Sequence, residues 1–355
     1  MGTNSVKDRA RSELTRLAAA RLDNDEFRQE AAALLRRAVG FDGWCWMLTD
    51  PAARLPIRGI GENLIVNRDI RRFTRILLNA WEDAREQFAP RPVAVLSVAT
   101  GGDLSRDRLS RDFLGPAGAG DLMSAPLVAD GVCWAQLYIY RDGSGRYFTE
   151  EDAGFVAGVA PMLAARLRGG LRGSACYDDA FEPGTIIVDQ ELSVVAATQA
   201  AWDWIDRLGL ERPNDAEPLP GFIYGVAMRV AMSRPEGDEP PRAARVRLQA
   251  ADGRWALVRV APLVSGAREA SGYAVTLEPA RSKDLIPLLM RAWLLTPRER
   301  EVASLVVDGL SSEDIARVLF ISWHTARDHI KAIFAKTGVS RRQDLVAALA
   351  GYVGP

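Results

Sequence analysis

The sequence predicts an α+β multidomain protein that ends in an all-α domain. Its 355 residues are enough for two or three domains of ordinary size. Up to Ala280, short runs typical of strands separate stretches in which apolar residues have helical spacing. From Leu295 onward, the pattern is helical alone, and each helix carries its own start and stop signals.

The composition is that of an ordinary globular protein, because 48% of the residues are apolar and the net charge is −1. No apolar segment resembles a signal peptide or could span a bilayer, so we expect no membrane contact. The three cysteines have no metal-ligand spacing and favour a reducing, cytoplasmic location. Cys45 and Cys133 could form a redox switch if their strands were neighbours, although buried thiols more often simply pack.

Residues 1–168 are expected to form one domain of helices and sheet. The helical spacing and the caps, which include Thr149, predict helices over residues 6–20, 24–39, 69–88, 106–114 and 150–167. The alternation and the turn residues predict strands over residues 44–48, 56–60, 93–98, 121–128 and 132–140.

The end of this domain resembles a known family. The run APLVADGVCWAQLYIYRDGSGRYFTEEDAGFVAGVAPMLAARL contains a hairpin with a glycine turn and an F-T-x-E-D helix start. This run is similar to the end of a GAF domain, and the resemblance extends over about residues 25–168. GAF domains bind small molecules between sheet and helices, so the resemblance implies an effector of unknown identity. The candidate ligand-binding side chains lie in the strands: Trp44, Trp46, Trp134 and Tyr138.

Core packing is the alternative interpretation of these four aromatic side chains. Strand alternation places Trp44 and Trp46 on one face of the sheet, so at least this pair points the same way.

A second unit follows a Gly-rich linker over residues 169–183. Its predicted strands are residues 184–189, 192–197, 245–249, 255–262 and 272–278, and its predicted helices are 198–208 and 223–232. The order of two strands, short helices and then three further strands resembles the topology of a PAS domain, and the resemblance rests on topology alone. The resemblance implies a PAS-like domain over residues 184–280, either ligand-binding or an interaction module. A helix over residues 284–294 then connects it, within segment 281–294, to the last domain.

Residues 295–355 carry the strongest local signals. A capping box at residues 296–299, with proline at the first helical position, begins a helix that Gly309 ends. Ser311 begins a short second helix, residues 320–322 form a turn, and Gly338 ends a longer third helix. A fourth helix follows. A short helix, a three-residue turn and a longer helix make a helix-turn-helix.

The third helix has one face on which polar side chains gather: His324, Arg327, Asp328 and Lys331. In a DNA-binding helix-turn-helix, the N-terminal half of this face lies in the major groove. Arginine and lysine can donate to guanine, and aspartate can accept from cytosine. A small helical bundle with an ordinary solvated face is the alternative.

This domain also resembles a known family. The segments LTPREREV, GLSSEDIA, IS..T...H and KTGVSRR are similar to the LuxR/NarL-type DNA-binding domain of bacterial transcription factors, over about 55 residues. The resemblance implies base contacts from Arg327, Asp328 and Lys331. It implies phosphate contacts from Thr325, Lys336 and Arg342, and a dimerisation surface on the fourth helix, residues 341–349.

Two residues depart from the family pattern. Ala326 stands where the family has valine, and Asp328 stands at a reading position that is usually neutral. Because its carboxylate would repel phosphate, Asp328 either reads cytosine or only tunes specificity.

The sequence therefore predicts a cytoplasmic bacterial regulator that binds a double-stranded DNA operator as a homodimer and responds to a small molecule. From Lys283 onward, ten Lys and Arg face eight Asp and Glu, so one domain alone should bind DNA weakly. A constitutive regulator whose front domains bind protein partners is the alternative.

Enzymatic function is not expected. Both histidines lie in the helix-turn-helix, and the sequence lacks the P-loop, G-x-S-x-G and H-E-x-x-H motifs. We therefore predict no catalytic residue, no metal and no cofactor, although carboxylate chemistry in the front domains is a third alternative.

Overall fold

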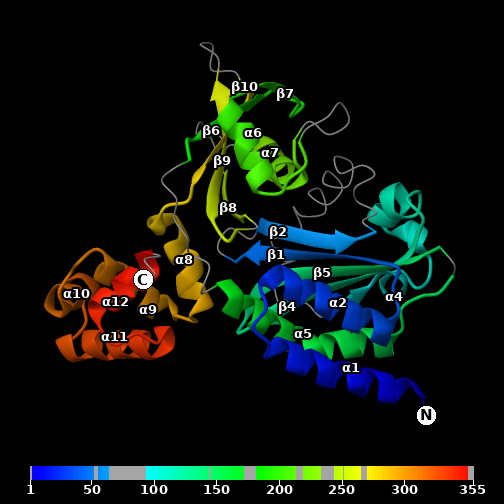
Figure 1. Cartoon of the computed structure of the whole chain (residues 1–355), viewed down its shortest axis with the longest axis horizontal. Helices are drawn as coiled ribbons and strands as arrows, with labels where there is room; N and C mark the ends of the chain where they lie inside the picture. The colour runs from blue at the N-terminus through cyan, green and yellow to red at the C-terminus, as the bar shows by residue number, and fades with distance from the viewer. Residues whose placement is uncertain are drawn as a thin grey trace.

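The computed structural model describes residues 2–51, 55–63, 93–143, 145–171, 181–212, 219–232, 244–250, 252–264 and 270–350. Within them lie two five-stranded sheets with their helices and a helical domain at the C-terminal end (Figure 1). The predicted helix over residues 69–88 and most of the predicted linker lie outside the described residues.

The first sheet is antiparallel and carries three helices on one face (Figure 1). The helices are α1 (Gly2–Ala18), α2 (Asn24–Val39) and α5 (Glu150–Gly170). The strand order is β2-β1-β5-β4-β3, with β1 (Gly43–Asp50), β2 (Leu55–Glu62), β3 (Ala94–Val95), β4 (Ala119–Ala129) and β5 (Val132–Asp142). The hydroxyl of Thr149 caps α5, as predicted.

One predicted strand of this domain is largely wrong, and one predicted helix differs in its start and its type. Only the first part of the strand predicted over residues 93–98 forms, and α4 (Leu96–Ala99) follows it. The cause is Asp121, whose carboxylate accepts hydrogen bonds from the backbone N–H and the hydroxyl of Ser97. The helix predicted over residues 106–114 forms over residues 108–114. It follows a 3₁₀ turn, η2 (Leu104–Arg106), and is a π-helix from η3 (Ser110–Leu114) onward, where Gly115 donates to the Ser110 carbonyl.

The second sheet repeats the strand order of the first, as β7-β6-β10-β9-β8, and is also antiparallel. Its strands are β6 (Gly184–Val188), β7 (Val194–Ala197), β8 (Ala244–Gln249), β9 (Trp255–Val264) and β10 (Ala270–Pro279), and its helices are α6 (Gln199–Arg207) and α7 (Gly221–Met232). All seven predicted elements are confirmed. The PAS-like identity of this unit stays a prediction.

The connecting helix α8 (Ser282–Ala292) lies between the second sheet and the C-terminal helices (Figure 1). These are α9 (Pro297–Val307), α10 (Ser312–Leu319), α11 (Trp323–Thr337) and α12 (Arg342–Ala350). The predicted caps at Thr296, Ser311 and Ser322 are confirmed by hydrogen bonds from backbone N–H groups. Gly338 ends α11 with a φ of 74°, a conformation that glycine adopts at little cost.

Candidate functional site

The helix α11 presents the predicted base-reading residues to solvent. Ala326 and Ile333 on its inner face are fully buried, whereas Arg327, Asp328 and Lys331 are exposed. No hydrogen bond or ion pair joins these three side chains to another described residue, so their polar groups can meet a partner from outside. The inner face follows from the 3.6-residue period of the apolar positions.

Sequence reasoning missed an aromatic neighbour of this face. The Arg327 guanidinium lies 4.6 Å from the centroid of the Trp323 ring, a cation–π distance. The spacing i, i+4 on a helix is the sequence signal that could have revealed this pair.

The three residues predicted to contact phosphate have different surroundings in the structure. Thr325 is exposed, and its hydroxyl lies 2.9 Å from the Ser322 hydroxyl. Lys336 Nζ donates to Glu299 Oε2 at 2.6 Å, and Arg342 donates to the Leu310 carbonyl. Lys336 and Arg342 therefore already bind groups of their own domain, and phosphate contacts from them stay a prediction.

Glu299 joins the start of α9 to the end of α11. Its carboxylate accepts from the Thr296 backbone N–H at 2.7 Å and from Lys336 Nζ. Burial alone would raise the pKa of Glu299, but the Lys336 and Thr296 hydrogen bonds lower it below its ordinary value of 4.5. The charged form of Glu299 is therefore stabilised by folding.

We expect Glu299→Gln to destabilise the C-terminal domain by about 1 kcal/mol near neutral pH, because the lysine end of the pair is partly solvated. Since folding lowers the pKa of Glu299, this stabilisation is complete above the ordinary pKa of 4.5 and is lost as the pH falls through the folded value. The melting-temperature difference between the wild type and Glu299→Gln, followed from neutral pH down, should therefore shrink below pH 4.5. A difference that stayed constant in acid would contradict this assignment.

The predicted dimerisation helix α12 is partly covered. It packs against α8 and α9, and Leu345 and Leu349 are fully buried. Gln343 and Asp344 on its other side are exposed. A dimer contact through α12 would therefore use this open side or require α8 to move.

The structure places three of the four candidate ligand-binding residues in the hydrophobic core. Trp44, Trp46 and Trp134 all belong to the main cluster, and Trp46 meets the ring of Phe27 in α2 at a centroid distance of 6.4 Å. Trp44 and Trp46 thus share the helix-covered face, as alternation predicts.

Trp134 is the extra residue of a β-bulge, because Leu127 pairs with Ala135 and Val128 pairs with Cys133. The indole N–H groups of Trp46 and Trp134 are buried and have no hydrogen-bond partner among the described residues.

Tyr138 lies on the opposite face of the sheet, where it pairs with Cys45. Burial, together with the nearby thiols of Cys45 and Cys133, raises the pKa of Tyr138 above its usual range. The four candidates therefore do not converge on one site, and their ligand-binding role stays a prediction.

The strands of Cys45 and Cys133 are neighbours, but their register separates the two thiols. Cys45 pairs with Tyr138, five residues from Cys133 along β5. At a rise of about 3.3 Å per residue, this offset far exceeds the Cα separation of roughly 7 Å that a disulfide can bridge. Burial also raises the pKa of Cys45 to about 12 and that of Cys133 to about 11, which disfavours the reactive thiolate.

One arginine connects three parts of the chain, and no local sequence pattern predicts this role. Arg247 in β8 forms an ion pair with Asp50, which is fully buried at the end of β1. The same guanidinium donates to the Asp284 carbonyl in the first turn of α8. Arg58 adds a second contact between the sheets, to the Gln249 carbonyl at 3.4 Å.

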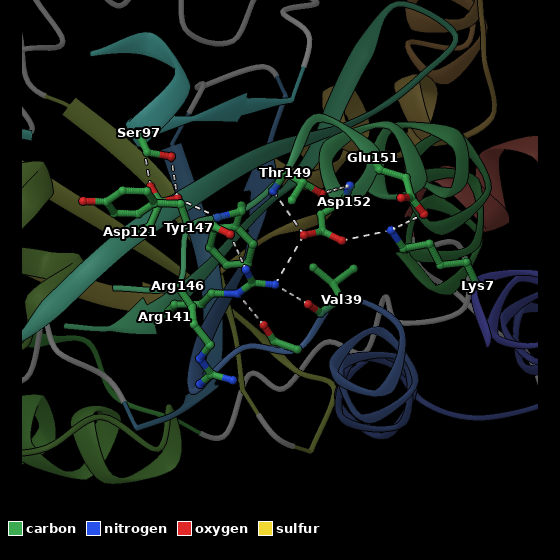
Figure 2. Close-up of polar contacts among 12 residues, drawn as sticks. Lys7, Val39, Ser97, Asp121, Arg141, Arg146, Tyr147, Thr149, Glu151 and Asp152 are labelled. Atoms are coloured by element: carbon green, nitrogen blue, oxygen red, sulfur yellow. Dashed lines mark hydrogen bonds and ion pairs between the residues drawn. The ribbon is translucent and has the colours of Figure 1, made fainter. Parts of the chain in front are cut away.

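A polar cluster fixes the N-terminal end of α5 (Figure 2). Lys7 and Arg141 approach the Asp152 carboxylate from opposite sides, at 2.9 and 3.3 Å. Burial alone would raise the pKa of Asp152, but the hydrogen bonds from Lys7 and Thr149 lower it. These charged groups form ion pairs and hydrogen bonds with one another. The cluster therefore has the properties of a structural contact that joins α1, β5 and α5.

No group of His, Cys, Asp and Glu within the described ranges has the arrangement of a metal site. Among the helices described, none combines the length and the apolar character that crossing a bilayer requires.

Comparison with known proteins gives two family matches. Residues 294–349 match the family described as bacterial regulatory proteins, luxR family. Residues 23–167 match the GAF domain.

Curated relatives match the C-terminal end. A protein of Mycobacterium bovis described as an HTH-type transcriptional regulator is 47% identical over 57 residues, which is 16% of this chain and 6% of that protein. The monoamine regulon transcriptional regulator of Klebsiella aerogenes is 46% identical over 54 residues, or 15% of this chain and 24% of the regulator. The chain thus spans less than a quarter of the length of these relatives.

Among solved structures, the VqmA dimer of Vibrio cholerae, described as a LuxR-type receptor, is 19% identical. The likeness covers 48% of this chain and 82% of that chain, with a TM-score of 0.23. A TM-score of this size does not show a shared fold.

Proposed function

We propose that this chain, which carries a DNA-binding domain of the luxR family behind a GAF domain, is a bacterial transcriptional regulator controlled by a small molecule. The observation that supports DNA binding best is the solvent-exposed face of α11 with Arg327, Asp328 and Lys331. In a helix-turn-helix, this face enters the major groove, where two cations and one carboxylate can read base edges.

The proposed partner is a double-stranded operator with two half-sites, bound by a homodimer. The C-terminal domain has few excess cations, so one copy neutralises few phosphates and binds weakly. Two copies on one operator would add their contacts, and the open side of α12 is the surface we assign to their contact.

Effector control is proposed to pass from the GAF domain through Arg247 to α8. Asp50 at the end of β1 and the Asp284 carbonyl of α8 share the Arg247 guanidinium, and α8 packs on α12. An effector that binds two arrangements of the GAF domain with different affinities would move this connection. The position of α8 would then decide how much of α12 is open to a second copy.

The test begins with genome-wide DNA occupancy, followed by titration of the recovered operator with the full-length protein. We expect Arg327→Ala and Lys331→Ala each to reduce discrimination at one or two base pairs by about 1–3 kcal/mol. Arg342→Ala provides the comparison at a proposed phosphate contact: if Arg342 binds phosphate, its loss should weaken binding to all sequences alike and make the salt dependence shallower.

Unchanged base preference in both Arg327→Ala and Lys331→Ala would refute the assignment of α11 to the major groove. The same titration with and without native cell extract tests effector control. Affinity that does not respond to extract would instead favour a constitutive regulator whose front domains bind protein partners.

A further inference from the structure

Trp323 occupies the first position of α11, and its indole ring lies against the guanidinium of Arg327 one helical turn later. The distance of 4.6 Å from Arg327 Cζ to the ring centroid is a cation–π contact. The His324 ring packs against the same indole edge-on, with centroids 5.0 Å apart. Because 37% of its surface is still exposed, Trp323 lies at the solvent boundary of the domain.

This arrangement leaves the donors of Arg327 free. A guanidinium has five N–H groups, and none of those of Arg327 donates a hydrogen bond to another described residue. The described part of the chain gives Arg327 no carboxylate partner that would compete. A free arginine side chain loses much rotamer freedom when it binds, whereas one already held against a ring loses less.

Lys331 provides the comparison within the same helix. It is exposed on the same face, one turn further along, and no aromatic ring contact holds it among the described residues. An ammonium group donates in any direction and needs little orientation, but a guanidinium must align its plane with guanine O6 and N7. Support by an aromatic ring is therefore most useful at Arg327.

We propose that Trp323 is a positioning residue that holds Arg327 in the orientation needed to read guanine in the operator. The inference rests on the proposed function. Trp323 acts through Arg327 and contributes to specificity at the base pair that Arg327 reads.

The test measures the affinity of the full-length protein for the recovered operator and for a set of operators with each base pair changed in turn. We expect Trp323→Ala to weaken operator binding about fivefold, the size of a cation–π contact at an exposed site. The lost preference should fall on the base pair that Arg327→Ala affects. Trp323→Phe keeps an aromatic face and should retain most of that preference.

The Arg327→Ala background separates positioning from a general structural role. The double variant Trp323→Ala/Arg327→Ala should bind like Arg327→Ala alone, because Trp323 has nothing left to position. If Trp323→Ala weakened all sequences equally in both backgrounds, its role would be structural and the inference would be overturned. A change of base preference that persisted without Arg327 would overturn it too, because Trp323 would then read DNA itself.

Unchanged base preference in Arg327→Ala would overturn the groove assignment and this inference with it. The outcomes of the preceding paragraph would overturn this inference alone, so the two failures can be told apart. The melting temperature of the C-terminal domain, measured for each variant, shows whether the variant folds. Trp323→Phe keeps the test decisive if Trp323→Ala does not fold.

Discussion

Replacing Arg247 by alanine should lower the free energy of unfolding by about 3 kcal/mol, as expected when a largely buried ion pair loses one partner. The Asp50 carboxylate is fully buried, and the Arg247 side chain is 16% exposed. The loss would also remove the hydrogen bond to the Asp284 carbonyl, so α8 should become less firmly attached to the second sheet. Chemical denaturation, with tryptophan fluorescence as the signal, measures the effect.

Arg245→Ala is the matched control for Arg247→Ala. Arg245 lies on the same strand and is exposed, so its replacement should change stability by less than about 0.5 kcal/mol. The effect of native cell extract on DNA affinity gives a second readout. If extract changes the affinity of the wild type, Arg247→Ala should reduce that change. Wild-type stability together with a wild-type response to extract would contradict the role assigned to Arg247.

Replacing Asp121 by alanine should cost about 3–5 kcal/mol, because several buried donors would lose their acceptor together. The carboxylate is 1% exposed and accepts from four groups: Ser97 N, Ser97 Oγ, Leu122 N and Phe148 N. Figure 2 shows how it lies beside the loop that leads into α5. Loss of Asp121 should therefore loosen two segments that are distant in sequence. Denaturation gives the magnitude, and faster hydrogen exchange at the Ser97 and Phe148 amides gives the location.

Asp121→Asn is the graded control. The amide keeps the size of the carboxylate but only one of its acceptor oxygens, so we expect an intermediate loss. Asp103→Ala should change stability little, because this carboxylate is half exposed and its contacts among the described residues, with Ser105 and Arg106, are local and lie at the surface. Equal losses in Asp121→Ala and Asp103→Ala would show that the buried donors find other acceptors.

The elements that can be predicted from the sequence are those whose signals are local. The caps at Thr149, Thr296 and Ser322 act within three residues, and the hairpin of β4 and β5 needs only its turn and its alternation. The solvent-exposed position of Arg327 follows in the same way from the period of α11.

The features that could not be predicted depend on contacts between residues that are far apart in the sequence. Residues 93–98 carry a strand pattern, but Asp121, 24 residues after Ser97, turns the chain away after β3. Arg247 and Asp50 are 197 residues apart, and no local pattern marks either as a partner of the other. The period of α11 likewise exposes Lys336 but does not reveal that Glu299 of another helix binds it.

The meeting of the two sheets has a consequence for handling the protein. Each sheet ends in an edge strand, β2 in the first and β8 in the second, and these two strands lie against each other (Figure 1). Edge strands carry unpaired backbone groups that can recruit strands of other molecules. In the intact chain, each sheet shields this edge of the other. Truncation between residues 171 and 181 would remove this contact from both edges at once, so we expect the separated halves to aggregate more readily than the whole chain.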